Sequence, residues 1–221
     1  MLQVINHSVD KKLLRNALSK IDNNEFKTSL NVPTGDFFYD PWIIKPEFKN
    51  TVWEDILNSL PFIKGEARII ILKPGTSYYC HADADDRWHL NLQSEFGFIC
   101  DIDQSIMHKL LTNGNWYEMN AGRRHTAANF GSIDRIQLVV RQLLKKNSLL
   151  DPVPVKIVTK IKTVDFRYQF DNTISLWLNQ ANKKGIICDF KFIETEVSFK
   201  VERNSLQSLT EIVPDIFEVV V

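Results

Sequence analysis

Cysteine is scarce in this sequence, with three residues among 221 and no C-x-x-C pair. An odd number without that spacing argues against a disulfide framework and against a zinc ribbon. Cys80, Cys100 and Cys188 are better explained as small buried hydrophobic residues. The ligands of a metal site would therefore have to be other side chains.

No charge of one sign predominates. Lys and Arg together number 27, and Asp and Glu together also number 27. Such a balance provides neither the basic field that attracts nucleic acid nor a solvating acidic tail. The C-terminal part of the chain, after DPVPV, has neither clustered basic residues nor an RNP-like aromatic motif. Nucleic acid is therefore not expected as a partner.

Long apolar runs are absent as well. The sequence has no run of about 18 apolar residues, the length that a membrane-spanning helix needs. The N-terminal stretch MLQVINHSVDKKLLRN lacks the basic segment followed by an apolar segment that forms a signal peptide. We expect a cytoplasmic globular protein with no membrane partner.

The chain does contain a series of short strand-like segments between Ala67 and Leu144, separated by turn signals. They are ARIIILK, SYYCHAD, RWHLNLQ, FGFICDI, IMHKLL, WYEMN, HTAANF and DRIQLVVRQLL. About eight strands in roughly eighty residues favour an antiparallel barrel or a jelly roll of the cupin type, in which two sheets enclose a pocket. Two helices, at residues 10–22 and in TVWEDILNSL, are predicted before it. The predicted fold is therefore mainly β.

The sequence after DPVPV has a different pattern. KIVTKIKTVDFRYQF predicts a strand, TISLWLNQANKKG a helix, IICDF and IETEVSFKV strands, SLQSLTEIV a helix and IFEVVV a strand. This β-α-β-β-α-β order is that of a small ferredoxin-like module. Two nearby prolines place the boundary near Asp151, giving domains at residues 1–150 and 151–221. The module would bind a protein partner, form a dimer contact or pack on the jelly roll.

Ligand-capable residues are concentrated in YCHADADDRWHLNL. His81 and Asp83 stand two positions apart, so on a strand they would project from the same face. His125 begins the later segment HTAANF and provides a third ligand. Two imidazoles and one carboxylate, with open positions left on the metal, are typical of non-heme Fe(II) oxygenases.

Three further residues are candidates for binding an organic acid. Arg135 follows His125 by ten residues and enters the apolar strand RIQLVV, where a buried guanidinium would need an anion. Arginine suits a carboxylate because it can offer two parallel donors. Arg87 and His89 share one face of RWHLNL and could reach the same carboxylate or that of the substrate.

The stretches LKPGTSYYCHADADDRWHLNL and NAGRRHTAANFGSIDRIQLVV resemble the aspartyl/asparaginyl β-hydroxylase family, over about a third of the chain. That family comprises 2-oxoglutarate- and Fe(II)-dependent dioxygenases on a double-stranded β-helix, including bacterial free-proline hydroxylases. The matching features are L-x-P-G, His81, the R-x-H formed by Arg87 and His89, His125, and the arginine ten residues beyond it.

The resemblance implies that His81 and His125 bind iron, while Arg135, Arg87 and His89 hold 2-oxoglutarate. Asp83 is the third candidate iron ligand. The implied reaction uses O₂ to hydroxylate an amino acid similar to Asp, Asn or Pro, free or within a peptide, and releases succinate and CO₂. The protein would then be an enzyme with a small-molecule amino acid or a peptide as substrate.

The neighbouring side chains have simpler expected roles. Asp85 and Asp86 are expected in a solvated turn, although either would replace Asp83 in another strand register. Trp88 should face the opposite side of the sheet from Arg87 and His89, in the core. Of two adjacent tyrosines, 78 and 79, one is expected to face the pocket.

Two other functional classes stay open. One is a catalytically silent cupin-like binding module, in which any metal is absent or structural. The other is a metal-dependent cupin enzyme without a 2-oxo acid, which would keep His81 and His125 but leave Arg135 no cosubstrate to hold. Formation of succinate distinguishes these alternatives from the dioxygenase.

Overall fold

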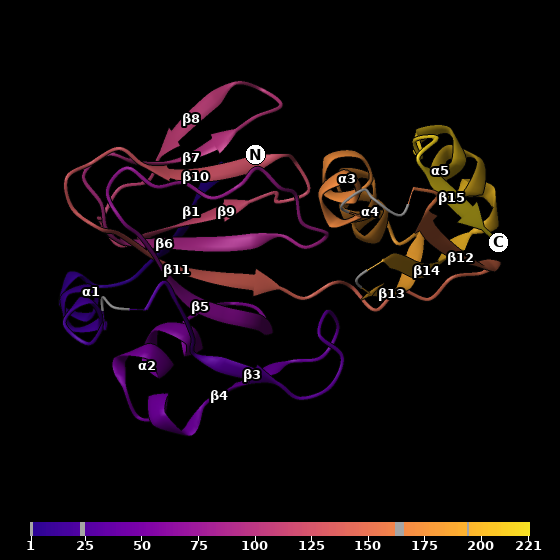
Figure 1. Cartoon of the computed structure of the whole chain (residues 1–221). Helices are drawn as coiled ribbons and strands as arrows, with labels where there is room; N and C mark the ends of the chain where they lie inside the picture. The colour runs from indigo at the N-terminus through magenta and orange to yellow at the C-terminus, as the bar shows by residue number, and fades with distance from the viewer. Residues whose placement is uncertain (1, 23–24, 162–165, 194) are drawn as a thin grey trace. The chain divides into compact units, whose positions relative to one another are not determined.

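The computed structural model describes residues 2–22, 25–161, 166–193 and 195–221, which form two compact units (Figure 1). The first unit contains the chain up to Cys80, Asp86–Asn120 and His125–Leu143. The second unit contains Leu144–Val221 together with two short segments, His81–Asp85 and Ala121–Arg124.

Among its described residues, the first unit has two main antiparallel sheets in addition to a two-stranded hairpin (Figure 1). The larger sheet has the strand order β1 (Leu2–Ser8), β9 (Asn115–Met119), β6 (Arg87–Gln93), β11 (Arg135–Gln142), β5 (Lys64–Leu72), β2 (Lys27–Ser29). The smaller sheet has the order β10 (His125–Asn129), β7 (Gly97–Asp101), β8 (Ile106–Lys109). After β6 the chain enters the smaller sheet for β7 and β8, returns to the larger sheet for β9, and then adds β10 to the smaller and β11 to the larger sheet. Such repeated crossing between two antiparallel sheets is that of a jelly roll of the cupin type. The mainly β fold predicted from the sequence is confirmed.

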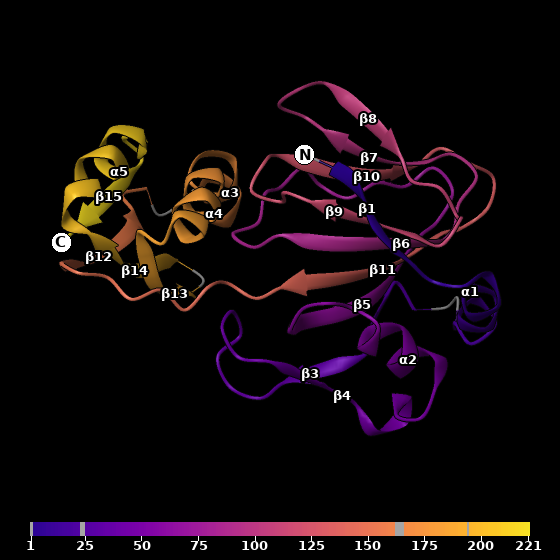
Figure 2. The ribbon, with the colours of Figure 1, turned by 180° about the vertical axis from the view of Figure 1, so that it is seen from behind.

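Helices cover one face of the larger sheet (Figure 2). Helix α1 (Lys11–Leu18) begins after Asp10, whose carboxylate accepts a hydrogen bond from the Lys12 amide at 2.7 Å. Helix α2 (Val52–Asn58) is capped by the Thr51 hydroxyl. Both predicted helices are therefore present, as short amphipathic helices with N-terminal caps. No helix in the described parts of the chain has the length and apolar character needed to cross a membrane.

The apolar core lies between these helices and the sheet. It includes residues of α1 and α2 and alternate residues of the three central strands: Leu14, Ala17, Trp53, Ile56, Ile69, Ile71, Trp88, Leu90, Leu92, Ile136, Leu138 and Val140. Trp88 lies in this core, as the alternation of the strand predicted. A short hairpin, β3 (Asn31–Pro33) with β4 (Trp42–Ile44), and the 3-10 helix η1 (Pro46–Phe48) complete this part of the unit.

The opposite face of the same sheet is polar although it is buried. Arg87, His89 and Asn91 alternate along β6 with the core residues, and Arg135 and Gln137 do so along β11. In the strand register Asn91 lies opposite Gln137, so these side chains share a face. Buried polar side chains in the middle of a sheet are costly unless they have partners or a ligand.

The segment SYYCHAD differs from its prediction as a strand. Two of its residues, Ser77 and His81, form isolated bridges; Ser77 pairs with Ala128 of β10, and the Tyr78 amide donates to the Ala127 carbonyl at 2.8 Å. The residues after His81, including Asp83, form an irregular loop that ends at the start of β6. The Asp83 amide instead donates to the carbonyl of Ala121, which is distant in sequence and outside any strand, at 2.7 Å.

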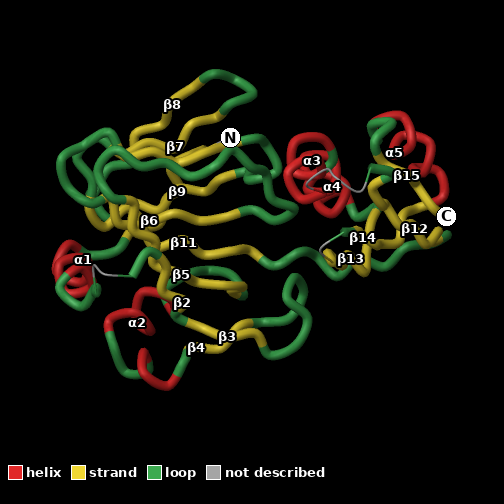
Figure 3. Tube along the Cα trace, viewed as in Figure 1, coloured by secondary structure: helices red, strands yellow, loops and turns green. Residues whose placement is uncertain are grey.

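The C-terminal part of the second unit has one four-stranded antiparallel sheet (Figure 3). Its elements are β12 (Pro152–Thr159), α3 (Phe166–Thr173), α4 (Ser175–Lys184), β13 (Ile187–Ile193), β14 (Glu196–Glu202), η2 (Arg203–Ser205), α5 (Leu206–Ile212) and β15 (Phe217–Val220). The sheet order β13-β14-β12-β15 is the ferredoxin-like arrangement that the order of elements predicted.

One part of the predicted strand KIVTKIKTVDFRYQF is wrong. The strand ends at Thr159, and the segment from Phe166 belongs to helix α3; residues 162–165 of that prediction lie outside the described part. Phe166 and Phe170 are buried and stack on each other one turn apart, a helical spacing that a strand reading overlooks. Helix α4 ends at Gly185, in the left-handed region with φ 78°, as the glycine stop predicted.

Candidate metal centre

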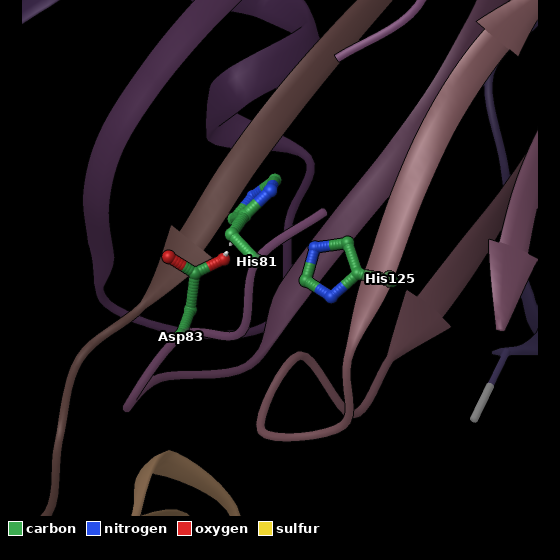
Figure 4. A group of neighbouring side chains, drawn as sticks. All are labelled: His81, Asp83 and His125. Atoms are coloured by element: carbon green, nitrogen blue, oxygen red, sulfur yellow. Dashed lines mark ion pairs between the residues drawn. The ribbon is translucent and has the colours of Figure 1, made fainter. Parts of the chain in front are cut away.

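His81, Asp83 and His125 come together in the structure (Figure 4). One ligand atom from each lies within 4.8 Å of those of the other two. The Nε2 atom of His81 is 3.6 Å from Oδ2 of Asp83. Asp83 and His125 are buried and His81 is half-buried. Two imidazole nitrogens and a carboxylate oxygen are suited to a divalent transition metal with open coordination positions.

Two different kinds of backbone position these ligands. His125 is the first residue of β10, where it lies opposite Asp101 of β7. His81 and Asp83 lie in the loop between β5 and β6 rather than on the predicted strand. The proximity of the three side chains therefore does not come from the two-residue period of a strand.

The loop that carries Asp83 is more buried than predicted. Asp85 is only 2% exposed, so the prediction of a solvated turn is wrong at this residue; Asp86 is half-buried. The residue before it, Ala84, accepts a hydrogen bond at its carbonyl from the side-chain amide of Asn179 in α4 at 3.2 Å. A prediction from local sequence could not include a helix almost a hundred residues away.

Arg135 is a buried cation. Its side chain is among the largest that are fully buried, and Nη2 has no hydrogen-bond partner. No acidic residue in the described segments forms an ion pair with it. Burial lowers the pKa of Arg135 to about 10. Since that value is well above neutral pH, the guanidinium of Arg135 stays charged although no carboxylate of the described residues is paired with it.

His89 and Gln137 lie on the same face as Arg135. His89 Nδ1 is 3.4 Å from Gln137 Oε1, while His89 Nε2 and Gln137 Nε2 are buried without a hydrogen-bond partner. Burial, reinforced by the charges of Arg135 and Arg87, holds the pKa of His89 well below its usual value. His89 is therefore neutral at physiological pH and can donate or accept one hydrogen bond at the free nitrogen.

Of the two tyrosines at positions 78 and 79, Tyr78 is the one that interacts with the buried arginines. Burial raises the pKa of its phenol, and the charges of Arg68, Arg135 and Arg87 partly oppose that shift. Tyr79, by contrast, is 67% exposed. The phenol of Tyr78 thus stays protonated and lies within the field of three arginines.

Sequence reasoning missed several members of this polar face. Arg141 is buried in β11, and its guanidinium lies 4.0 Å from the ring centre of Phe37, in the loop between β3 and β4. Gln137, Val139 and Arg141 follow Arg135 at intervals of two residues along β11, and of these only Val139 is apolar. The alternation of RIQLVVR would have found them, since it places every second residue on one face.

Comparisons with known proteins give a likeness in structure only. No family model matches the chain, and no curated protein matches it. Among solved structures, it is similar to a cupin domain from Bordetella pertussis, with TM-score 0.32, 13% identity, and coverage of 37% of this chain and 84% of that one. It is also similar to CapF, solved with the inhibitor 3-isopropenyl-tropolone, with TM-score 0.32, 15% identity, and coverage of 58% of this chain and 34% of that one. The fold assignment rests on the strand order described above.

Proposed function

We propose that the protein is a 2-oxoglutarate- and Fe(II)-dependent dioxygenase that hydroxylates an amino acid, free or within a peptide. The observation that carries this proposal is the buried Arg135, which has no acidic partner among the described residues; His81, Asp83 and His125 provide a candidate metal group in the same protein. A metal group alone would fit many cupins, but a buried cation without an anion calls for an anionic ligand.

The three clustered side chains suit Fe(II). Imidazole nitrogens and a carboxylate are ligands that Fe(II) accepts, and no cysteine belongs to the group. His81, Asp83 and His125 would hold the ion and leave other coordination positions open. His81 and Asp83 would supply their ligand atoms from the segment before β6, and His125 would supply its nitrogen from the start of β10.

The polar face suits a dicarboxylic 2-oxo acid. Arg135 would bind the carboxylate distant from the metal, and the buried Nε2 atoms of Gln137 and His89 would provide further hydrogen bonds. Arg87, on the same face of β6 as His89, would add positive charge. When bound, iron and 2-oxoglutarate supply the oxidative chemistry, with O₂ consumed and succinate and CO₂ released.

The protein's own residues would orient the reactants and exclude water. Apolar walls favour this, since Ile70, Leu72 and Met119 occupy the polar face beside the arginines and are buried. The loop between β3 and β4 places Phe37 against Arg141, and we place the contacts to the amino acid or peptide in this loop and in the other loops that connect strands.

An anaerobic titration tests this function. Purified protein freed of metal is titrated with Fe(II) and then 2-oxoglutarate while the visible charge-transfer absorption of the chelate is followed. We expect the band in the wild type and in His108→Ala, which changes a histidine of β8 outside the group, and no band in His125→Ala. A screen of amino acids and peptides for succinate release then identifies the substrate.

Other outcomes would favour other functions. Fe(II) binding without the charge-transfer band would contradict a 2-oxoglutarate site and favour a cupin enzyme without a 2-oxo acid. Failure to bind any divalent metal would contradict the enzyme altogether and leave a silent binding module.

A further inference from the structure

The loop that carries two of the candidate ligands packs on helix α4. His81–Asp85, Ala121–Arg124 and α4 all belong to the second unit. The side-chain amide of Asn179 in α4 donates to the carbonyl of Ala84, the residue next to Asp83, at 3.2 Å. Asn179 is only 2% exposed. A helix of the C-terminal module therefore makes a buried polar contact with the metal loop.

A second contact connects the same helix to the turn formed by Ala121–Arg124. A Cβ atom placed on Gly122 would lie 2.8 Å from Cβ of Asn179 and 3.2 Å from Cα of Leu176. Helix α4 therefore lies directly on the backbone of this turn. Its neighbour Ala121 accepts the hydrogen bond of the Asp83 amide at 2.7 Å. Asn179 thus contacts the two backbone segments that are joined at Asp83.

The residue type is difficult to explain by the stability of the helix. Asparagine is a poor former of helix interiors because its side chain competes for backbone hydrogen bonds. Burial of its amide is also unfavourable unless the amide has partners. Alanine or leucine would suit a helix position that only packs against a neighbour.

We infer that Asn179 is a positioning residue for the metal centre: it holds the His81–Asp85 loop in the conformation in which His81 and Asp83 can bind a metal. The inference rests on the proposed metal site. It gives the C-terminal α/β module a role in metal binding through α4, in addition to any partner that the module has.

Co(II) binding to the full chain tests this inference, because Co(II) reports affinity and coordination through its visible absorption without any turnover. We expect Asn179→Ala to weaken Co(II) binding by about 10-fold or more, the usual effect of removing an outer partner of metal ligands. Gly122→Ala, which forces α4 away from the turn, should weaken it similarly. Gln180→Ala changes the exposed neighbour of Asn179 on the same helix and should bind Co(II) as the wild type does.

A destabilised variant distinguishes positioning from a general loss of stability. Ile157→Val alters the core of the C-terminal sheet, far from the loop in sequence, and should lower the melting temperature while keeping Co(II) affinity. Circular dichroism confirms that each variant is folded at the temperature of the titration. Wild-type affinity in Asn179→Ala would overturn the inference, as would equal weakening in Asn179→Ala and Ile157→Val. Absence of Co(II) binding in the wild type would instead overturn the proposed metal site.

Discussion

Gly97 of β7 leaves the space in which the side chain of Arg135 lies. A Cβ atom at Gly97 would lie 2.8 Å from Arg135 Nε and would overlap Cδ of the same side chain. The smaller sheet therefore approaches the guanidinium through a residue without a side chain, and the absence of that side chain decides where Arg135 can point.

Replacement of Gly97 by alanine should displace the guanidinium and weaken 2-oxoglutarate binding. A hydrogen bond to a charged group contributes about 1.5–3 kcal/mol. Loss of the contact between Arg135 and 2-oxoglutarate should therefore raise the dissociation constant of 2-oxoglutarate by roughly 10- to 100-fold. Titration of the Fe(II)-loaded protein with 2-oxoglutarate measures this. The affinity for Fe(II) should stay at the wild-type value, because Gly97 and Arg135 are not among the proposed metal ligands. A loss of affinity for both Fe(II) and 2-oxoglutarate would contradict this division of roles.

Arg135→Met should make the protein free of ligands more stable while abolishing 2-oxoglutarate binding. The wild type buries a guanidinium without an acidic partner among the described residues, and replacing buried charges by apolar side chains of similar size is often neutral or stabilising by up to about 4 kcal/mol. Urea unfolding of both proteins without ligand measures the change. A marked loss of stability would mean that Arg135 has a structural role, and the proposal that it binds 2-oxoglutarate would be wrong.

The strands and helices could be predicted from the sequence where apolar and polar residues alternate with a regular period. RWHLNLQ became β6 with Trp88 on the apolar side and His89 on the polar side, because alternate residues of a strand face opposite ways. Helix α3 was missed because Phe166 and Phe170 are one helical turn apart within a segment that was read with the strand before it.

The candidate site was only partly predictable. His125, Arg135 and His89 lie on strands, so their positions followed from the local pattern. His81 and Asp83 belong to a segment whose backbone hydrogen bonds to Ala121, and Ala84 of that segment accepts a hydrogen bond from a helix of the C-terminal module. Neither contact is local in sequence, so no period could have indicated them.

His125→Ala should remove metal binding without affecting the fold of the jelly roll. The change deletes one of three clustered ligands, and even outer partners of metal ligands cost about 10- to 100-fold in affinity, so a loss of at least about 100-fold is expected. Isothermal titration with Mn(II), under conditions where circular dichroism shows a folded protein, measures it. His108→Ala serves as the matched control. Unchanged Mn(II) affinity in His125→Ala would exclude this residue as a ligand.

His89 should make stability depend on pH below neutrality. Its pKa is held well below the usual value in the folded protein, whereas in the unfolded chain it is about 6.5. Between these values only the unfolded chain takes up the proton, so its uptake favours unfolding. Stability from this residue is therefore present above about pH 6.5 and is lost as the pH falls below it, by about 1.4 kcal/mol per pH unit until the folded pKa is reached.

Comparison with His89→Gln isolates this contribution, because the other histidines are common to both proteins. Urea unfolding without metal at about pH 7.5 and about pH 5.5 should show the wild type losing about 1.4 kcal/mol more than the variant over this interval. The neutral glutamine has no proton to gain, and its amide can still hydrogen bond on the polar face. An equal loss in both proteins would mean that His89 takes up its proton in the folded state, next to Arg135 and Arg87. The buried face would then tolerate a further positive charge, contrary to the neutral donor proposed for it in binding 2-oxoglutarate.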